Sequence, residues 1–430
     1  MSKKKSLQAV IVDGLRTPFL KAGTGFADQQ AYQLAASSIE NILKKHSIDK
    51  SEVDHVIMST TIHNLYTSNI ARESTLAAGL PMTTPSYTVS AAGASAAVAI
   101  SQAIQMVSLG KAECIIAGGT DCASDVPIGY RKKMQQKLFK ARKLKTISDH
   151  VRFLLSLNPL DFLPEIPEVR ERSTGLTMGQ FTESLATQLG ISRSEQDKFA
   201  VASHQLAAKA QKKGYLKKEI GSVKVSESET IGKDNGIREK VKLSELTNLK
   251  PAFSKNGTLT AGNSSFLTDG ASVVLIMSEA KAKSLSLQPK ARLVDEVFTA
   301  HDPSTDLLTG PVFATEKLLK QTKTSTRDIG VFEYHEAFAA QILSVLKCLD
   351  SNEFAKKRLN RSQKIGEIDR DKLNQWGGSL AIGNPFAPNF ARLLTTACNR
   401  LHVENQERAL VGTCAGGGFG YAMMLEPYLN

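Results

Sequence analysis

Three side chains that can do chemistry lie beside glycine-rich segments of this sequence. His335 lies in the run FEYHEAF, Asn384 in IGNPFAP and Cys414 in CAGGG. A histidine shares protons near neutral pH, an asparagine amide donates hydrogen bonds, and a cysteine thiol acts as a nucleophile or an acid. Each residue by itself is more often structural than functional. Their joint occurrence beside glycines, after strand-like runs, favours a functional site.

The glycines suggest how such a site would be built. Small residues cluster at four places, which are 91–95, 261–265, 377–383 and 414–420. Two clusters fall where a strand should lead into a helix, and backbone N–H groups at a helix start form an anion or oxyanion site. A helix start would also favour a neutral His335 and a lowered pKa for Cys414. The alternative is that these glycines only permit close packing of the backbone.

Alternating strands and helices must position these residues. We expect buried strands at residues 8–13, 54–60, 86–90 and 113–119, and helices at 31–44 and 94–109. Further strands are expected at 272–277, 329–334 and 409–414, and further helices at 337–348 and 387–401. Strands that alternate with helices predict an α/β fold, with a largely parallel sheet covered on both faces.

The chain divides into two similar halves and an insertion. Residues 10–18 (VIVDGLRTP) resemble residues 292–300 (RLVDEVFTA), and each run opens a series of strands and helices. Residues 121–250 are rich in charge and in helix formers, which predicts an inserted, mostly helical region. We therefore expect an N-terminal half at 1–120 plus 251–290, and a C-terminal half at 291–430.

Composition narrows the class of protein. The 430 residues are 41% hydrophobic and 22% charged, with a net charge of +12, which is typical of an ordered protein that could bind a polyanionic small molecule. Five scattered cysteines favour a reducing compartment over a disulfide framework or a metal site. The N-terminal run MSKKKSLQAV has no apolar signal core, so we expect cytoplasmic residence. No nucleic-acid motif accompanies the charge, so we expect no nucleic-acid partner.

Eight ordered motifs resemble the thiolase family, most of all its long-chain 3-ketoacyl-CoA branch, which forms the β subunit of the trifunctional β-oxidation complex. They are IVDGLRTPF (11–19), AGGTDCASDVP (117–127), KDNGIR (233–238), LKPAF (249–253), LTAGNSSFLTDGAS (259–272), YHEAF (334–338), WGGSL (376–380) and CAGGG (414–418). The resemblance implies five layers (αβαβα) with a helical loop domain inserted in the first half. It implies coenzyme A as substrate or ligand with no further cofactor, a homodimer or tetramer, and a hydratase/dehydrogenase partner subunit.

The resemblance also assigns site residues one by one. Cys414 matches the family's acid/base cysteine, and His335 matches the histidine before Glu-Ala-Phe. Gly93 falls where the family keeps its nucleophilic cysteine, and Asn384 falls where it keeps the activating histidine. The following residues, 387–390 (APNF), also depart from the family's glycine and small residues. Four positions facing coenzyme A are retained, which are Met178, Ser264, Ser265 and Phe338.

Glycine cannot form an acyl-enzyme, and the Asn384 amide cannot take a proton near neutral pH. Three functions follow. The first is acyl-CoA binding with covalent thiolysis absent or very weak. The second is an enzyme without a covalent intermediate, in which His335, Asn384 and Cys414 support acyl transfer or decarboxylation. The third is an active 3-ketoacyl-CoA thiolase.

A basic segment precedes an apolar one inside the insertion. Residues 131–145 (RKKMQQKLFKARKLK) carry eight basic residues and no acidic one, and apolar residues cluster in 146–164. This pattern predicts peripheral contact of 131–164 with an anionic membrane, which the family branch also implies. The alternatives are a docking element for a partner subunit and a solvated helical hairpin that closes over the substrate tunnel.

Overall fold

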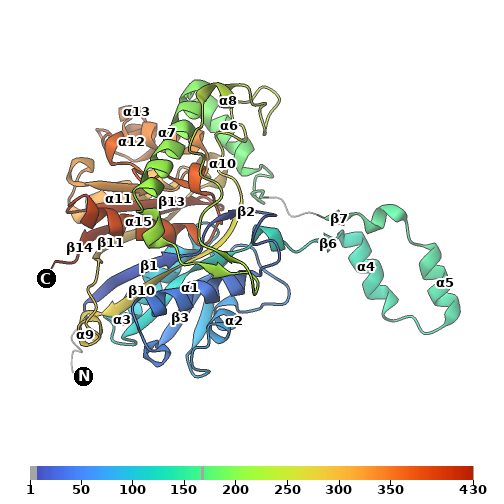
Figure 1. The fold of residues 1–430 in the computed structure, drawn as a ribbon. Coiled ribbons are helices and arrows are strands. Elements are labelled where there is room, and N and C mark those ends of the chain that lie inside the picture. The colour runs from blue at the N-terminus through green and yellow to red at the C-terminus, as the bar shows by residue number, and fades with distance from the viewer. Residues whose placement is uncertain (1–6, 166–168, 430) are drawn as a thin grey trace.

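The computed structural model describes residues 7–165 and 169–429. The basic residues 3–5 of the N-terminal lead lie outside this part of the chain. Two sets of strands form the body (Figure 1). The first runs in the order β1 (Ala9–Arg16), β10 (Thr268–Ser278), β5 (Cys114–Asp121), β3 (His55–Ser59) and β4 (Ser86–Val89), with the short β2 (Leu20–Lys21) beside β10. The second runs in the order β11 (Ala291–Ala300), β14 (Phe419–Pro427), β13 (Ala409–Ala415) and β12 (Val331–Tyr334). One residue pair, Ile11 with Ala291, joins them.

The expectation of a largely parallel sheet is wrong, because each set is mixed. β3 is parallel to β4 and β5, and β12 is parallel to β13. β10 is antiparallel to β1 and β5, and β14 is antiparallel to β11 and β13. The turn at 416–418 is too short for a crossover connection, so β14 must return alongside β13 as a hairpin.

The weak internal repeat corresponds to matching strands. β1 and β11 each carry an irregularity in register at the same place, between Ile11 and Asp13 in one and between Leu293 and Asp295 in the other. In each strand the aspartate carboxylate accepts a hydrogen bond of 2.8 Å from the next backbone N–H. The repeat therefore extends to local backbone geometry.

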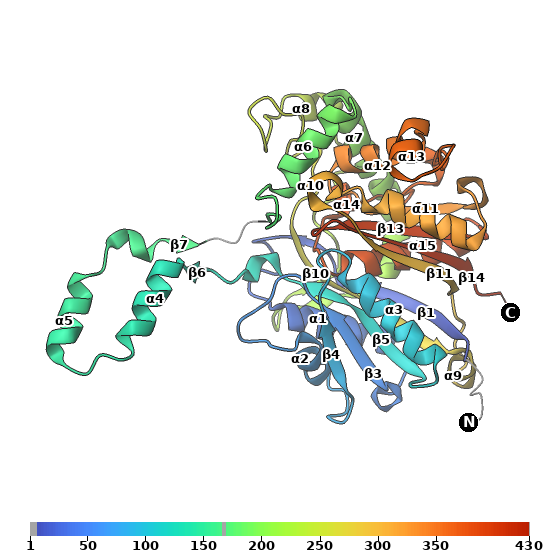
Figure 2. The ribbon, with the colours of Figure 1, turned by 180° about the vertical axis from the view of Figure 1, so that it is seen from behind.

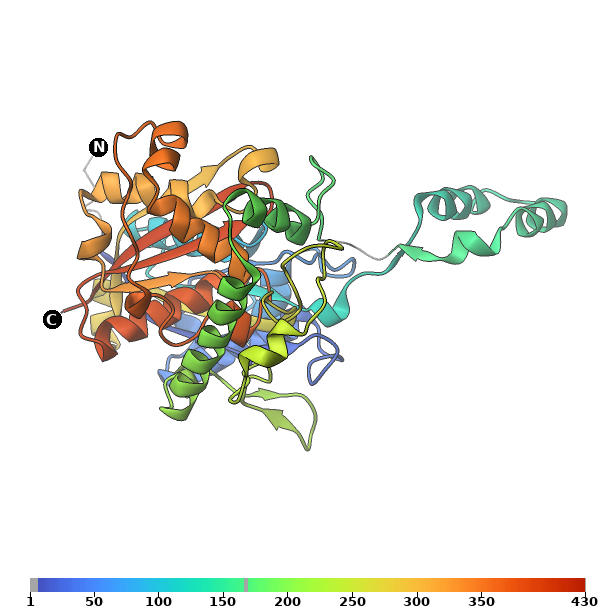
Figure 3. The same ribbon diagram turned by 90° about the horizontal axis from the view of Figure 1, so that it is seen from above.

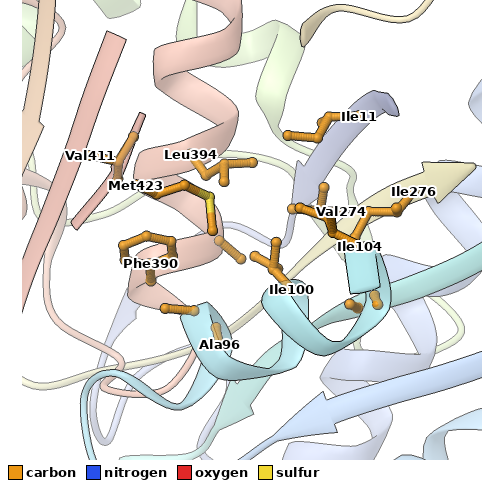
Figure 4. Packing of buried hydrophobic residues seen from close by; sticks show 14 of the residues in the cluster. Ile11, Ala96, Ile100, Ile104, Val274, Ile276, Phe390, Leu394, Val411 and Met423 are labelled. Carbon is orange, nitrogen blue, oxygen red and sulfur yellow. The ribbon is translucent and has the colours of Figure 1, made fainter. Parts of the chain in front are cut away.

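Helices form three layers, one outside each set of strands and one between the two sets. α1 (Ala31–Lys45) and α2 (Ile70–Ala77) pack outside the first set of strands, and α11 (Gly310–Thr322) and α12 (Ala339–Leu349) pack outside the second. α3 (Ser95–Ser108) and α15 (Asn389–Val403) lie together between the two sets. Figure 4 shows this middle layer, where Ile100 and Leu394 meet side chains from both sheets, including Val274 and Met423. The result is five layers in the order αβαβα, as the resemblance implies.

Strand alternation explains why each sheet serves two layers. Val274 and Ile276 face the middle helices, whereas Val273 and Leu275 face the outer ones. Successive strand side chains point to opposite faces, so a fully apolar strand is buried on both sides. Shorter helices complete the two halves, which are α9 (Glu279–Ser284), α10 (Pro303–Asp306), α13 (Asn352–Arg358) and α14 (Ser379–Ile382).

The inserted region is mostly helical, as predicted, but it has two different parts. α6 (Met178–Gln188) and α7 (Arg193–Lys212) pack on α12 of the second half, and α8 (Leu243–Thr247) packs on α7. A two-stranded ribbon of β8 (Val223–Lys224) and β9 (Thr230–Ile231) follows α7. The proposed division at 121 and 250 stays a prediction.

The other part is an arm that projects away from the body (Figures 2 and 3). It consists of the pair β6 (Gly129–Tyr130) and β7 (Pro164–Glu165) and the helices α4 (Lys132–Ala141) and α5 (Ile147–Leu155). The arm does not close over the body. Within the two described ranges, no helix has the length and apolar character needed to cross a bilayer.

Candidate functional site

Residues from both halves and the insertion line one cavity of about 670 Å³. All eight residues that the sequence singled out lie on its wall, which are Met178, Ser264, Ser265, Phe338, Gly93, His335, Asn384 and Cys414. The tertiary structure therefore brings the candidate catalytic and coenzyme A-facing positions together. Their individual roles stay predictions.

Gly93 lies immediately before the middle-layer helix α3. A tight turn forms there, in which Ser95 Oγ accepts the Ala91 N–H at 2.7 Å and Ala92 adopts a left-handed φ of 49°. A Cβ atom added to Gly93 would lie 3.3 Å from the Cys414 carbonyl oxygen and 3.6 Å from the Ala415 Cβ. A side chain at position 93 would therefore start in contact with Cys414 and Ala415, which lie directly beside Gly93.

His335 follows β12 and is almost completely buried. Its Nδ1 lies 2.9 Å from Ser379 Oγ and 2.8 Å from Asn389 Nδ2. Burial, with a smaller contribution from the Arg392 guanidinium, lowers the pKa of His335 to about 3. The sequence predicted a neutral imidazole correctly, but the causes are burial and Arg392 rather than the start of a helix.

The buried Glu336 side chain accounts for the glycine at position 378 of the WGGS motif, which contains Ser379. Its buried carboxylate accepts hydrogen bonds from Ser203 Oγ at 2.8 Å, Asn374 Nδ2 at 2.7 Å and the Leu380 N–H at 3.2 Å. A Cβ added to Gly378 would lie 1.9 Å from the Glu336 carboxyl carbon, so only glycine fits. The glycine lets the chain pass close to Glu336 and so brings Ser379 to His335.

Cys414 lies at the end of β13, and the expectation of a lowered pKa is wrong. The segment that follows is the β13–β14 hairpin rather than a helix, with Gly417 and Gly418 at φ of 86° and 74°. Burial raises the pKa of the Cys414 thiol to about 12. Glu171 of the insertion accepts the Gly417 N–H at 2.8 Å and anchors the hairpin. Cys414 is therefore a neutral thiol at physiological pH.

Asn384 lies in the loop before α15. Its Oδ1 accepts the Phe386 N–H at 3.0 Å and the Asn389 amide at 3.2 Å, while its Nδ2 donates to Ser265 Oγ at 3.4 Å. The Asn384 carbonyl accepts the Thr268 N–H at 3.3 Å, which fixes this loop against β10. The amide is thus held on the cavity wall by neighbours from two segments.

The coenzyme A-facing positions form a mostly apolar wall. Met178 is the first residue of α6, and Phe338 directly precedes α12. The Phe338 ring meets the Phe253 ring edge-on, with 5.6 Å between centroids. Ser265 Oγ donates to the Ala337 carbonyl at 2.8 Å. Such a cavity, apolar with a few fixed polar groups, is typical of a small-molecule site.

Sequence reasoning missed four residues around the site. Asn389, Arg392 and Ser379 surround His335, and His63 lines the cavity with its Nε2 3.4 Å from Ser90 Oγ. The only signal for Asn389 was its place in the APNF run, which departs from the family pattern. Ser379 lies in the quoted WGGSL motif, but nothing in the sequence marked its side chain, Arg392 or His63 as part of the site. In the part of the chain that the structure describes, no cluster of His, Cys, Asp or Glu side chains is arranged to hold a metal ion.

Comparison with known proteins identifies the family. The model of the thiolase N-terminal domain matches residues 9–280, and that of the thiolase C-terminal domain matches residues 287–427. The mitochondrial trifunctional enzyme subunit beta of Bos taurus is 43% identical over 430 residues, covering 100% of this chain and 90% of the relative. A 3-ketoacyl-CoA thiolase of Yersinia pestis is 40% identical over 419 residues, covering 97% of this chain and 96% of the relative.

A solved structure agrees with these matches. The acetyl-CoA acetyltransferase of Bacillus anthracis superposes with a TM-score of 0.85 at 30% identity, covering 99% of this chain and 100% of that one. The two family models together cover nearly the whole sequence, and so does each of the two relatives. The chain therefore belongs to the thiolase family.

Proposed function

We propose that this protein binds acyl-CoA in the cavity and that its covalent thiolysis is absent or very weak. The observation that carries the proposal is Gly93, which lines the cavity at the place where the family resemblance expects the nucleophile. Loss of a nucleophile lowers the rate by roughly 10³–10⁶ while binding and polarising groups are kept. The relatives named 3-ketoacyl-CoA thiolase suggest that the ligand is an acyl-CoA of fatty-acid oxidation.

The protonation states of the other groups support this proposal. With a pKa of about 12, only roughly 10⁻⁵ of Cys414 is thiolate at pH 7, so it is a poor replacement nucleophile. With a pKa of about 3, His335 holds a proton too weakly to act as the base that activates a thiol. Asn384 cannot accept a proton at all in this pH range.

A second candidate is non-covalent acyl transfer or decarboxylation. It is favoured by the common location of His335, Asn384 and Cys414 on the cavity wall. In that reaction His335 and Asn384 would donate hydrogen bonds to a thioester oxygen, and Cys414 would supply or take a proton at carbon. The third candidate, an active 3-ketoacyl-CoA thiolase, is favoured by the names of the relatives alone.

One experiment separates the three candidates. The purified protein is incubated with acetyl-CoA and, separately, with acetoacetyl-CoA plus CoA. Binding is followed by calorimetry, adducts by intact-protein mass spectrometry and turnover by chromatography. Saturable binding without adduct or turnover supports the proposal. Turnover without an adduct supports non-covalent chemistry. An acetyl adduct with turnover refutes the proposal and supports a thiolase. The Cys414→Ala variant is the matched control, because an adduct that disappears in it belongs to Cys414.

We also propose a partner subunit and a homo-oligomer. Relatives at 42–43% identity carry the name trifunctional enzyme subunit beta, which supports assembly with a hydratase/dehydrogenase subunit. Size-exclusion chromatography with light scattering should give a dimer or tetramer mass. A monomer at micromolar concentration would refute the homo-oligomer.

We further propose that this protein resides in the cytoplasm and that residues 131–164, which form most of the arm, make peripheral contact with an anionic membrane. Apolar side chains are largely exposed there, including Phe139 (67%), Ile147 (86%) and Leu155 (81%). They lie on the same short arm as the basic residues of α4, an arrangement typical of surface-bound amphipathic helices. The described residues that line the cavity include Val126, Pro127, Val169 and Arg170 on either side of the arm, but none of 131–164. The projection of the arm argues against a hairpin that closes over the tunnel.

Vesicle flotation tests this contact. The protein should float with vesicles containing 30% phosphatidylserine at low salt, and binding should fall as salt screens the lysines. The variant Phe139→Ser/Ile147→Ser should bind less. Leu109→Ser, a substitution at an exposed leucine outside the arm, is the control. Equal flotation of all three proteins, or none, would contradict the contact.

A further inference from the structure

We infer that Asn389 is a positioning residue that makes both His335 and Asn384 hydrogen-bond donors toward the same cavity. The site would then take a ligand oxygen that only accepts hydrogen bonds, such as a thioester or ketone carbonyl. This inference rests on the proposed function for the identity of the ligand, but not for the arrangement of the donors.

The chain of contacts begins at Arg392, one turn into α15. Its Nη2 lies 3.0 Å from Asn389 Oδ1 and 3.0 Å from Ser379 Oγ. Arginine carries donors only, so the Asn389 carbonyl oxygen must face the guanidinium. Both side chains are almost completely buried, which leaves no water to exchange for this contact. The orientation of the Asn389 amide is therefore fixed by chemistry.

The two protons of the Asn389 NH₂ group then have defined acceptors. Asn389 Nδ2 lies 2.8 Å from His335 Nδ1 and 3.2 Å from Asn384 Oδ1. Because Nδ1 accepts this bond, the single proton of the neutral imidazole must be on Nε2. The Ser379 hydroxyl, 2.9 Å from the same Nδ1 and 3.3 Å from Asn389 Oδ1, is compatible with this tautomer because it can share the Nδ1 lone pair as a second donor or donate to Asn389 Oδ1.

Asn389 also determines the orientation of the Asn384 side-chain amide. Asn384 Oδ1 already accepts from Asn389 and from the Phe386 N–H at 3.0 Å, so its NH₂ group points the other way. That group makes one long contact of 3.4 Å to Ser265 Oγ, and Ser265 also lines the cavity. A ligand oxygen can therefore replace a weak bond rather than a strong one.

The surrounding charges keep His335 from taking a second proton, which would turn its Nδ1 from an acceptor into a donor. Burial and the positive charge of Arg392 oppose protonation of His335, so the imidazole holds one proton. The carboxylates of Glu333 and Glu336 act on Arg392 from the same strand region, and Cys414 in the cavity is a neutral thiol. Two donors without a base beside them can stabilise negative charge on an oxygen, but cannot remove a proton from a ligand.

Nitrogen-15 NMR of histidine-labelled protein tests the arrangement directly. The His335 signals are identified by their absence in His335→Gln. We expect the neutral Nε2–H tautomer from pH 5 to pH 8 in the native protein. In Asn389→Asp the acceptor oxygens face Nδ1, so His335 should gain a proton there and titrate about 2 pH units or more higher. Asn405→Asp, the same change at an exposed position after the same helix, should leave the signals unchanged.

Two outcomes overturn the inference. One is an Nδ1–H tautomer, or a protonated His335 between pH 5 and 8, in the native protein. The other is an unchanged tautomer in a folded Asn389 variant. If Asn389→Asp does not fold, Asn389→Leu has similar size without hydrogen-bonding groups, and it should give a mixture of tautomers. An unchanged Nε2–H signal in Asn389→Leu counts against the inference.

Ligand binding separates this inference from the proposed function. Calorimetry with acetyl-CoA should give an affinity about tenfold lower in Asn389→Leu than in the native protein, since one hydrogen bond is misdirected. The affinity for free CoA, which has no acyl carbonyl, should stay within twofold. The expected NMR pattern without any binding of acetyl-CoA refutes the proposed function and supports the donor arrangement.

Discussion

Restoring the two missing side chains should return thiolysis only when both are present. The perturbation is Gly93→Cys with Asn384→His. A Cβ at Gly93 would lie 3.3 Å from the Cys414 carbonyl oxygen and 3.6 Å from Ala415 Cβ, so the neighbours must move by only a few tenths of an ångström. We expect a loss of about 1 kcal/mol in the free energy of unfolding, at the low end for added volume.

The gain in rate follows from what each residue supplies. A cysteine at position 93 without a base is mostly a thiol, and a base at position 384 without a cysteine has nothing to activate. Each single variant should therefore gain less than about tenfold. Together they should gain about 10³-fold, which corresponds to about 4 kcal/mol of transition-state stabilisation.

The assay is CoA-dependent cleavage of acetoacetyl-CoA, followed by loss of its absorbance, with mass spectrometry for an acetyl group on the introduced cysteine. Ala92→Cys with Asn384→His is the matched control, because it adds the same thiol one residue away on the same cavity wall. A folded double variant that gains less than tenfold would refute the reasoning and implicate the 387–390 run. A control variant of equal activity would refute the assignment of position 93.

The remaining predictions concern stability and reactivity. Gly378→Ala should lower the free energy of unfolding by about 2–4 kcal/mol in urea titrations, because its Cβ would displace the buried Glu336 carboxylate. Phe390→Ala should cost about 3–5 kcal/mol by the same method, since the ring is fully buried in the middle layer. Between pH 6.5 and about 3 the unfolded protein binds the His335 proton and the folded one does not, so stability falls on acidification by up to about 1.4 kcal/mol per pH unit. His335→Gln should lose that part of the pH dependence, and an unchanged profile would contradict the low pKa. Iodoacetamide at pH 8 should leave Cys414 unmodified in folded protein, since its pKa is about 12.

The local pattern of apolar residues was sufficient to predict the position of most helices and strands. The helix predicted at 31–44 is α1 at Ala31–Lys45, and the strand predicted at 409–414 is β13 at Ala409–Ala415. Long apolar runs and evenly spaced apolar side chains specify these elements locally, so little tertiary information was needed. Strand direction was different. Nothing in the β10 sequence says that it returns antiparallel to β1 and β5, because direction depends on where the chain comes back after the insertion.

For the site, too, the residue types could be read from the sequence, whereas the charge state of Cys414 could not be predicted from it. The residue types at 93, 335, 384 and 414 were readable from the sequence, together with the consequence that glycine and asparagine cannot perform covalent thiolysis. The pKa of Cys414 was not, because it depends on burial, and burial depends on a hairpin that sequence pattern mistook for a helix start.

The sequence by itself determined which chemical groups exist, that the chain has two related α/β halves, and that it resembles thiolases. The tertiary structure decided which of those groups meet and in which orientation. Arg392, Asn389 and His335 come from two elements, yet their contacts of about 3 Å assign the imidazole proton to Nε2. Hydrogen-bond direction depends on distances between side chains that are far apart in the chain, and the spacing of residues in the sequence does not give those distances.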